Sequence, residues 1–277
     1  MSEFSLYKDS LNKLIEISIK AGRAIMDIYE TDFDFEKKSD QSPLTAADLC
    51  SHKIISDSLS KLNPKIPILS EESSGITIAE RSSWDEYWLI DPLDGTKEFI
   101  NRNGEFTTNI ALMKKNKPIF GIIHAPYLNQ TYWGGESLGS YYLEGDLDSD
   151  IEKITASPSS NQEIRIVSSR SHPNDNLKHI LKMTGDHKII SIGSSLKFCL
   201  IAAGEADCYL RLGPTSEWDT AAGDAIVKSS GGSVKAIDGS ELKYNKSDSI
   251  LNPSFIAASN EELIIKIVDI INSSYEK

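Results

Sequence analysis

Cysteine and long apolar runs are both scarce in this chain of 277 residues. Its three cysteines form no Cys-x-x-Cys pair, and any disulfide scheme leaves one of them unpaired, which is typical of a protein from a reducing compartment. No apolar run approaches the ~20 residues that span a bilayer, and the acidic start Met1-Ser2-Glu3-Phe4 is not followed by the apolar core of a signal peptide. We therefore expect a cytoplasmic protein, and peripheral association with the inner membrane is left open.

Basic residues are also few. The chain has 29 Lys and Arg against 41 Asp and Glu, so its net charge is -12. Such a chain repels nucleic acid, and a polynucleotide partner is not expected. A small anionic substrate must instead be attracted locally, by metal ions and a few positioned basic groups. The sequence shows no internal repeat and leaves the oligomeric state open.

The first half of the chain alternates helical and hairpin patterns. Apolar residues recur at steps of three and four over residues 11–29, and a second amphipathic helix begins near Asp48. Apolar segments at 107–113 and 118–124 flank a turn and predict a hairpin, and a second hairpin is predicted around residues 132–143. We predict residues 1–150 to be helices packed on a mostly antiparallel sheet, with a short additional strand over residues 31–38.

The pattern changes near residues 146–162, which are rich in Asp, Ser and Pro. Beyond this stretch, predicted strands and helices alternate, so residues 151–277 are expected to form an α/β lobe. The predicted strands are 163–169, 188–193, 208–212 and 255–258, and the predicted helices are 173–183, 194–203, 220–229 and 261–271, the last capped by Asn260.

Two carboxylates follow the apolar strand predicted over residues 87–90, in the sequence Asp91-Pro92-Leu93-Asp94-Gly95-Thr96. Pro92 fixes one backbone dihedral and Gly95 allows a tight reversal, so the side chains of Asp91 and Asp94 can converge on one point. Two carboxylates that close repel each other unless a cation lies between them, which favours a hard ion such as Mg²⁺. A surface β-turn explains these six residues equally well.

Two more acidic segments have the same character, and a further acidic residue, Asp48, lies upstream. Glu71 and Glu72 follow a short apolar strand, Asp219 opens a helix of small residues, and Asp48 lies three residues after Thr45. Taken singly, Glu71 and Glu72 read as solvated loop charges, Asp219 as an N-cap, and Asp48 as part of a capping box with Thr45. Taken together, the segments of Asp91, Glu71 and Asp219 can supply the four or five oxygen ligands of a hydrolytic metal centre, and Asp48 could instead accept a proton relayed from a hydroxyl.

These segments resemble, in order, the motifs of the lithium-sensitive, metal-dependent phosphatases of the inositol-monophosphatase superfamily. The most specific pair is Asp-Pro-Leu-Asp-Gly-Thr at residues 91–96 with Trp-Asp-x-Ala-Ala-Gly at 218–223. Within the superfamily, residues 96–100, 102–107 and 193–199 look most like the CysQ-type 3′(2′),5′-bisphosphate nucleotidases. The resemblance implies an α/β fold with an α+β first lobe and an α/β second lobe, arranged as a layered α-β-α-β-α sandwich with the active site between the lobes.

The resemblance also implies the roles of individual residues at the metal site. Two Mg²⁺ ions are implied, with a third, weaker ion in some family members, and the role of Glu72 is left open. The Asp48 and Thr96 pair would help to deprotonate the attacking water, next to the ion that Glu71 binds. The backbone amides of Gly95 and Thr96 would hold the phosphate that is cleaved. The implied metal ligands are Glu71, Asp91, the Leu93 carbonyl, Asp94 and Asp219, with Asp91 bridging two ions.

For the nucleotide, the resemblance implies His172, Ser194, Lys197, Arg211 and Asp219 as binding residues. Lys197 and Arg211 would clamp the phosphate that is not cleaved. Without the resemblance, Lys197 reads as a solvated helix charge, Arg211 as a strand-edge charge and His172 as a structural loop histidine.

The implied activity is Mg²⁺-dependent hydrolysis of the 3′-phosphate of adenosine 3′,5′-bisphosphate to AMP and phosphate, which in this family recycles a by-product of sulfur assimilation. An inositol or sugar phosphate phosphatase on the same scaffold is the nearest alternative. A catalytically silent anion sensor is a further alternative. The presence of all the motif carboxylates argues against it.

Overall fold

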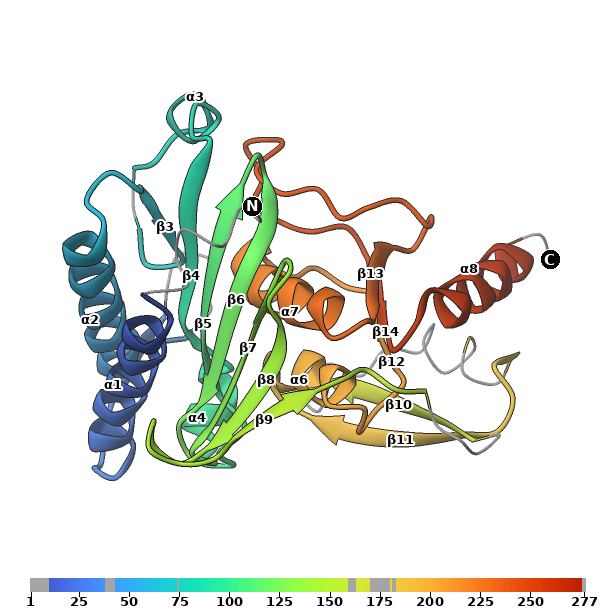
Figure 1. Cartoon of the computed structure of the whole chain (residues 1–277), viewed down its shortest axis with the longest axis horizontal. Coiled ribbons are helices and arrows are strands. Elements are labelled where there is room, and N and C mark those ends of the chain that lie inside the picture. The colour runs from blue at the N-terminus through green and yellow to red at the C-terminus, as the bar shows by residue number, and fades with distance from the viewer. Residues whose placement is uncertain are drawn as a thin grey trace.

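The computed structural model describes residues 10–37, 43–73, 75–158, 163–169, 180 and 183–275. Two sheets dominate it, one of seven strands and one of five, and helices lie on both sides of each (Figure 1). Two short strands, β1 (Phe35–Lys37) and β2 (Pro43–Thr45), pair separately. None of the helices in these ranges is long and apolar enough to cross a membrane.

The seven-stranded sheet has the order β3-β4-β5-β6-β7-β8-β9, and only its β3 and β4 run parallel. The tight connection between β5 and β6 passes through Lys115 and Asn116, whose φ angles of 48° and 59° suit the right-handed twist of a hairpin. The predicted hairpins and the mostly antiparallel sheet are therefore confirmed. The strands are β3 (Ile68–Ser70), β4 (Glu86–Asp94), β5 (Thr107–Lys114), β6 (Lys117–Ala125), β7 (Gln130–Gly135), β8 (Gly139–Glu144) and β9 (Ile151–Ile154).

Helices cover both faces of this sheet. On one face lie α1 (Leu11–Tyr29) and α2 (Ala46–Leu62), and on the other lie α6 (Leu196–Ala202) and α7 (Glu217–Ser229). Alternate side chains of strand β4 pack on opposite faces of the sheet. Trp88 and Ile90 pack in the core under α1 and α2, whereas Tyr87 and Leu89 pack in the core that includes α6 and α7. Because side chains alternate along a strand, the next odd-numbered residue, Asp91, also points toward α7.

Helix α7 packs unusually close to the sheet. A Cβ atom on Gly121 of β6 would lie 2.3 Å from the carbonyl oxygen of Ala222, so the strand needs a glycine there and the helix needs a small residue opposite it. The run of small residues at 221–223 therefore does more than form a helix. It sets the depth at which the helix that begins with Glu217 meets the sheet.

The five-stranded sheet has the order β11-β10-β12-β14-β13. Its β10 runs parallel to both neighbours, whereas β14 runs antiparallel to β12 and β13. Helix α8 (Glu261–Tyr275) packs on the outer face through Ile264, Ile267 and Ile271, and the Asn260 side chain accepts a hydrogen bond from the Leu263 amide at its start (2.8 Å). The strands are β10 (Ile164–Ser169), β11 (His187–Ile192), β12 (Cys208–Arg211), β13 (Ser233–Ala236) and β14 (Phe255–Ala258).

The predicted α-β-α-β-α sandwich is confirmed, since α1 and α2, the first sheet, α6 and α7, the second sheet and α8 follow one another across the molecule (Figure 1). The strand predicted over 31–38 is confined, in the described residues, to β1. The helix predicted over 173–183 lies mostly outside the described residues. Strands β2, β9 and β13 were not expected, and because β9 pairs with β8 the first sheet continues past residue 150. The division of the chain at residue 150 stays a prediction.

Candidate active site

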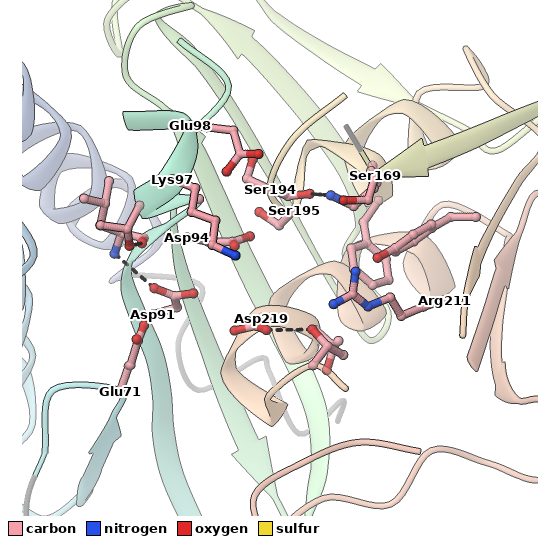
Figure 2. Close-up of a pocket in the computed structure, with 18 residues that line it drawn as sticks. Glu71, Asp91, Asp94, Lys97, Glu98, Ser169, Ser194, Ser195, Arg211 and Asp219 are labelled. Carbon is pink, nitrogen blue, oxygen red and sulfur yellow. Dashed lines mark hydrogen bonds between the residues drawn. The ribbon is translucent and has the colours of Figure 1, made fainter. Parts of the chain in front are cut away.

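A pocket of ≈ 250 Å³ lies where β4 ends and α6 and α7 begin (Figure 2). The short helix α4 (Thr96–Ile100) and strand β12 complete its wall. Both carboxylates and basic side chains line the pocket. The lining residues are Glu71, Asp91, Leu93, Asp94, Gly95, Thr96, Lys97, Glu98, Ser169, Ser194, Ser195, Lys197, Phe198, Tyr209, Arg211, Thr215, Asp219 and Thr220.

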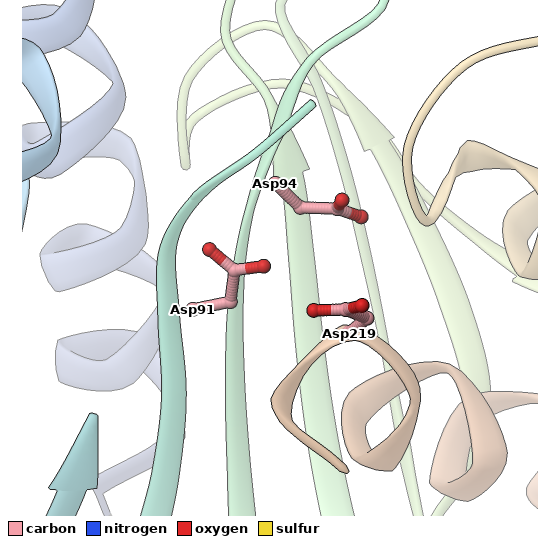
Figure 3. Close-up of side chains that lie close together, drawn as sticks. All are labelled: Asp91, Asp94 and Asp219. Carbon is pink, nitrogen blue, oxygen red and sulfur yellow. The ribbon is translucent and has the colours of Figure 1, made fainter. Parts of the chain in front are cut away.

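Three aspartates from two distant segments converge in this pocket. A carboxylate oxygen from each of Asp91, Asp94 and Asp219 lies within 4.8 Å of the other two (Figure 3). Asp91 and Asp94 would point to opposite faces of a regular strand, but the pairing of β4 with β5 shifts register between them. This irregularity turns both carboxylates to the same side. The convergence predicted from the Pro92 and Gly95 turn is thus present.

Asp219 is held in place by the start of α7. Its Oδ2 accepts hydrogen bonds from the Thr215 hydroxyl (2.6 Å) and from the Ser216 amide (2.9 Å). Ser216 is the N-cap and Asp219 is the third residue of the helix, so the reading of Asp219 as the N-cap itself is wrong. The capping box ties one carboxylate oxygen to the helix end and points the acidic group at the other two aspartates.

The electrostatics of the cluster favour a bound cation. Burial raises the pKa of Asp91 well above its ordinary value, and the charges of Glu71 and Asp94 raise it further. Burial and the neighbouring Asp219 raise the pKa of Asp94 to about 7. A divalent ion among the carboxylates removes this repulsion, and a set of ligands made of oxygens alone suits Mg²⁺. The residues present therefore fit a magnesium site.

Glu71 lies beside this cluster, at the end of β3. Its backbone amide donates to the Ile90 carbonyl (3.1 Å), and its side chain points toward Asp91 (Figure 2). Leu93 also lines the pocket, and its carbonyl accepts a hydrogen bond from the Thr96 hydroxyl (3.3 Å). Glu72 is not among the residues that line the pocket.

Asp48 uses its two oxygens differently. Oδ2 accepts from both the amide (2.7 Å) and the hydroxyl (2.6 Å) of Thr45, which forms the capping box of α2. Oδ1 lies 3.4 Å from the Thr96 hydroxyl, which can donate to it. The capping role predicted from spacing is confirmed, and the second oxygen is directed at the pocket. The structure therefore contains a contact for each role inferred for Asp48: the bonds to Thr45 for capping and the approach to Thr96 for proton transfer.

The basic residues implied to bind nucleotide also line this pocket. Lys197 on α6 is only 6% exposed, and its Nζ donates to the Ser194 carbonyl and lies 5.5 Å from the centre of the Tyr209 ring. Arg211 stands on β12, between β10 and β14, and donates to the Pro214 carbonyl (2.6 Å). The readings as a solvated helix charge and a strand-edge charge are wrong, because Lys197 is buried and β12 is an interior strand. His172 lies outside the described residues.

Arg211 also has an unused donor. Its Nε is buried and makes no hydrogen bond to any described group, although a buried guanidinium normally satisfies its donors. A donor of this kind in the wall of a pocket is suited to an anionic ligand.

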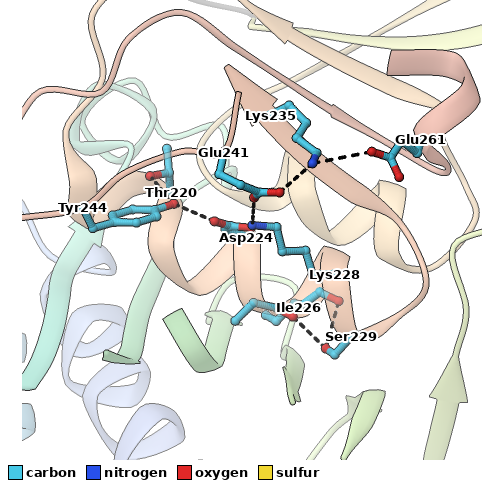
Figure 4. A network of polar contacts seen from close by, with 10 residues as sticks. Thr220, Asp224, Ile226, Lys228, Ser229, Lys235, Glu241, Tyr244 and Glu261 are labelled. Atoms are coloured by element: carbon cyan, nitrogen blue, oxygen red, sulfur yellow. Dashed lines mark hydrogen bonds and ion pairs between the residues drawn. The ribbon is translucent and has the colours of Figure 1, made fainter. Parts of the chain in front are cut away.

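Helix α7 is anchored from behind by a polar network (Figure 4). The fully buried Asp224 forms an ion pair with Lys228 (2.9 Å) and accepts from the Tyr244 hydroxyl (3.0 Å), which in turn lies 3.4 Å from the Thr220 hydroxyl. Thr220 lines the pocket, so the network runs from the pocket to the surface. Its outer members are Glu241, Lys235 and Glu261.

Comparison with known proteins decides the family. The family model described as "Inositol monophosphatase family" matches residues 8–273. The chain belongs to the inositol monophosphatase family. This confirms the resemblance inferred from the motifs. The family is metal-dependent, and Asp91, Asp94 and Asp219 are a set of ligands that could hold a metal ion.

Relatives within the family share much of the sequence. The chain is 45% identical over 248 residues to the 3′(2′),5′-bisphosphate nucleotidase CysQ of Escherichia coli (strain K12), which covers 88% of this chain and 98% of that protein. It is 35% identical over 259 residues to the CysQ protein of Haemophilus influenzae, with coverage of 93% and 95%. The crystal structure of CysQ from Bacteroides thetaiotaomicron matches with a TM-score of 0.81 at 38% identity, over 93% of this chain and all of that one.

Several polar pocket residues were not anticipated from sequence. Glu98, Ser169 and Ser195 line the pocket, and Asn109 lies directly behind it, 3.5 Å from Asp94. A usable signal was present at Asn109, since an amide in the apolar stretch Thr107–Lys114 is unusual for a buried strand.

Proposed function

We propose that this protein is a 3′(2′),5′-bisphosphate nucleotidase that hydrolyses the 3′-phosphate of adenosine 3′,5′-bisphosphate to AMP and phosphate. The observation that carries this proposal is that one pocket contains both a cluster of three aspartates and the basic side chains of Lys197 and Arg211. A substrate with two phosphates fits such a pocket, because one can meet the metal-binding side while the other meets the bases. The relatives named above as bisphosphate nucleotidases support the same substrate class.

Asp91, Asp94 and Asp219, with Glu71 and the Leu93 carbonyl, are proposed to hold Mg²⁺. When bound, Mg²⁺ neutralises phosphate oxygens, lowers the pKa of water and stabilises the leaving oxygen. Asp91 stands between Glu71 and the other two aspartates, which is the place for a bridging carboxylate (Figure 2). Two or three ions stay a proposal that follows from the family resemblance.

Thr96 and Asp48 are proposed to receive the proton of the attacking water. The Thr96 hydroxyl lies in the pocket wall and is within reach of both the Leu93 carbonyl and Asp48 Oδ1. Asp48 is 1% exposed, so it would take up a proton through the Thr96 hydroxyl, which lies between it and the pocket. A proton that Thr96 accepts on its oxygen can be balanced by the one it donates to Asp48.

Lys197 and Arg211 are proposed to hold the 5′-phosphate, which is not cleaved. Ser194 precedes them in the wall with a φ angle of 46°, a strained conformation for a residue with a side chain and one that is common at binding sites. The backbone amides of Gly95 and Thr96 are proposed to hold the scissile phosphate. Contacts of His172 and Asp219 with the nucleotide stay predictions from the resemblance.

A phosphate-release assay with and without Mg²⁺ tests this function directly. Adenosine 3′,5′-bisphosphate should be hydrolysed only with Mg²⁺, and AMP should be the product. Faster hydrolysis of inositol 1-phosphate would favour the inositol phosphatase alternative. Binding of the bisphosphate without turnover would favour a silent anion sensor. The cytoplasmic location and any peripheral membrane association stay predictions.

A further inference from the structure

A chain of buried hydroxyl and amide groups connects Asp94 to the segment that precedes Lys197. Ser195, Thr107 and Asn109 are each at most 2% exposed. The Ser195 hydroxyl donates to Asn109 Oδ1 (2.7 Å) and lies 2.7 Å from the Thr107 hydroxyl, and Asn109 Nδ2 lies 3.5 Å from Asp94 Oδ2, to which it donates. These contacts join strand β5 to the start of α6, across 86 residues of sequence.

The contacts determine which way the Asn109 amide points. Its oxygen accepts from the hydroxyl of Ser195 (2.7 Å) and, at a longer distance, from that of Thr107 (3.3 Å), and its nitrogen faces the carboxylate of Asp94. The reversed amide would place its oxygen against that carboxylate, two acceptors facing each other without a proton between them. A hydroxyl that donates to the amide oxygen therefore holds the N–H group in the direction of Asp94. Buried polar chains of this kind are rigid when every member is satisfied.

We propose that Asn109 is a positioning residue that orients the Asp94 carboxylate for metal binding, and that Ser195 acts through Asn109 by fixing its amide. This inference rests on the metal site proposed above. Residues that hydrogen-bond to metal ligands orient them, and their removal typically weakens metal affinity about 10- to 100-fold. Ser195 also directly follows Ser194 in the segment proposed to bind nucleotide, so one buried network holds both parts of the site.

The test measures Mn²⁺ binding to the purified, substrate-free protein by electron paramagnetic resonance. Wild type should bind Mn²⁺, and Asp94→Asn should lose much of that affinity, which establishes the site itself. Asn109→Ala should raise the Kd for Mn²⁺ about 10-fold or more. Ser195→Ala should raise it by a smaller factor. The double variant should match Asn109→Ala alone, because a residue that acts only through Asn109 has no further effect once Asn109 is gone.

Thr108 provides a matched control on the same strand. It is fully buried, and its hydroxyl lies 3.2 Å from that of Ser18 on α1, on the opposite face of the sheet from Asn109. Thr108→Val removes a buried hydroxyl and should lower the thermal stability, yet leave the Kd for Mn²⁺ unchanged. This separates orientation of Asp94 from a general loss of stability in β5.

Three outcomes would overturn the inference. An unchanged Kd in folded Asn109→Ala would show that Asp94 needs no orientation by the amide. Losses that multiply in the double variant would show that Ser195 acts independently. If Asn109→Ala does not fold, Ser195→Ala decides, and wild-type affinity in that variant counts against the proposal. Failure of wild type to bind Mn²⁺, or an unaltered Asp94→Asn, would instead overturn the metal site on which the inference rests.

Discussion

Asp48 Oδ1 lies 3.4 Å from the Thr96 hydroxyl, whereas Oδ2 accepts the hydrogen bonds of the helix cap. One side chain therefore serves the stability of α2 and the proposed chemistry through different oxygens. This division matters because spacing alone suggests only the cap. It also means that the two roles can be separated by mutation.

Asp48→Asn should lower kcat by at least ~100-fold, because an amide of the same shape cannot take up the proton. Thr45→Val is the matched variant, since it removes the hydroxyl that Oδ2 accepts from and leaves Oδ1 next to Thr96. It should cost about 1 kcal/mol of stability, as lost caps do, with kcat nearly unchanged. Steady-state kinetics and urea unfolding of both variants check this. Near-normal kcat in Asp48→Asn would rule out the proton role.

Asp91→Asn should lower activity by at least ~100-fold, since it removes charge from the centre of the proposed ligand set. The control is Asp224→Asn, another buried aspartate that lies in the network behind α7 and outside the cluster. That variant should lose stability but keep its dependence on Mg²⁺ concentration. The comparison requires activity measured against Mg²⁺ for both variants. Full turnover of Asp91→Asn at saturating Mg²⁺ would show that the metal assignment is wrong.

Other ions should not replace Mg²⁺. Ca²⁺ takes longer bonds and a looser geometry than Mg²⁺, so the attacking water is misaligned and Ca²⁺ should inhibit. Li⁺ should also inhibit, as implied by membership of this family. Initial rates with each ion added to the Mg²⁺-loaded enzyme measure both effects, with Na⁺ at equal ionic strength as the control. Rates indifferent to both ions would contradict the proposed centre.

His124 should make folding stability depend on pH. It is 2% exposed, its Nδ1 lies 2.9 Å from the Thr131 hydroxyl, and burial lowers its pKa to about 4. The unfolded chain binds this proton near its ordinary pKa of about 6.5. The contribution of the neutral His124 to the free energy of unfolding is therefore fully present above a pH of about 6.5. It is lost as the pH falls toward 4, at up to about 1.4 kcal/mol per pH unit.

The variant His124→Asn isolates this contribution. The stability difference between wild type and variant should shrink by about 2 kcal/mol between pH 7 and pH 5. The raised pKa of Asp94 acts in the opposite direction, but it is present in both proteins and cancels in the comparison. Urea unfolding at the two pH values provides the measurement, and parallel pH profiles would show that His124 does not titrate as inferred.

The sequence predicts most of the helices and strands well because periodicity and turn residues are local, whereas their layered arrangement is implied by the family resemblance. The sequence also predicts that Asp91 and Asp94 converge, although the structure achieves this by an irregularity within β4 and not by the expected turn. It does not predict β13, because an alternation of only four residues, Ser233–Ala236, is weak evidence for a strand. Nor does it predict the burial of Lys197, because that depends on the packing of α6 against the second sheet. The link between Ser195 and Asn109 is equally invisible, since it joins residues 86 positions apart.

The most direct test of the central claim is the ratio of kcat/KM for adenosine 3′,5′-bisphosphate to that for 3′-AMP, in wild type and in Arg211→Ala. A ratio is needed because Arg211 also influences the pKa of Asp219, and any loss at the metal site affects both substrates equally. A charge-assisted contact is worth about 1.5–3 kcal/mol, so the wild-type ratio should exceed unity and fall roughly 10- to 150-fold in the variant. An unchanged ratio, or a wild-type preference for inositol 1-phosphate over the bisphosphate, would contradict the account.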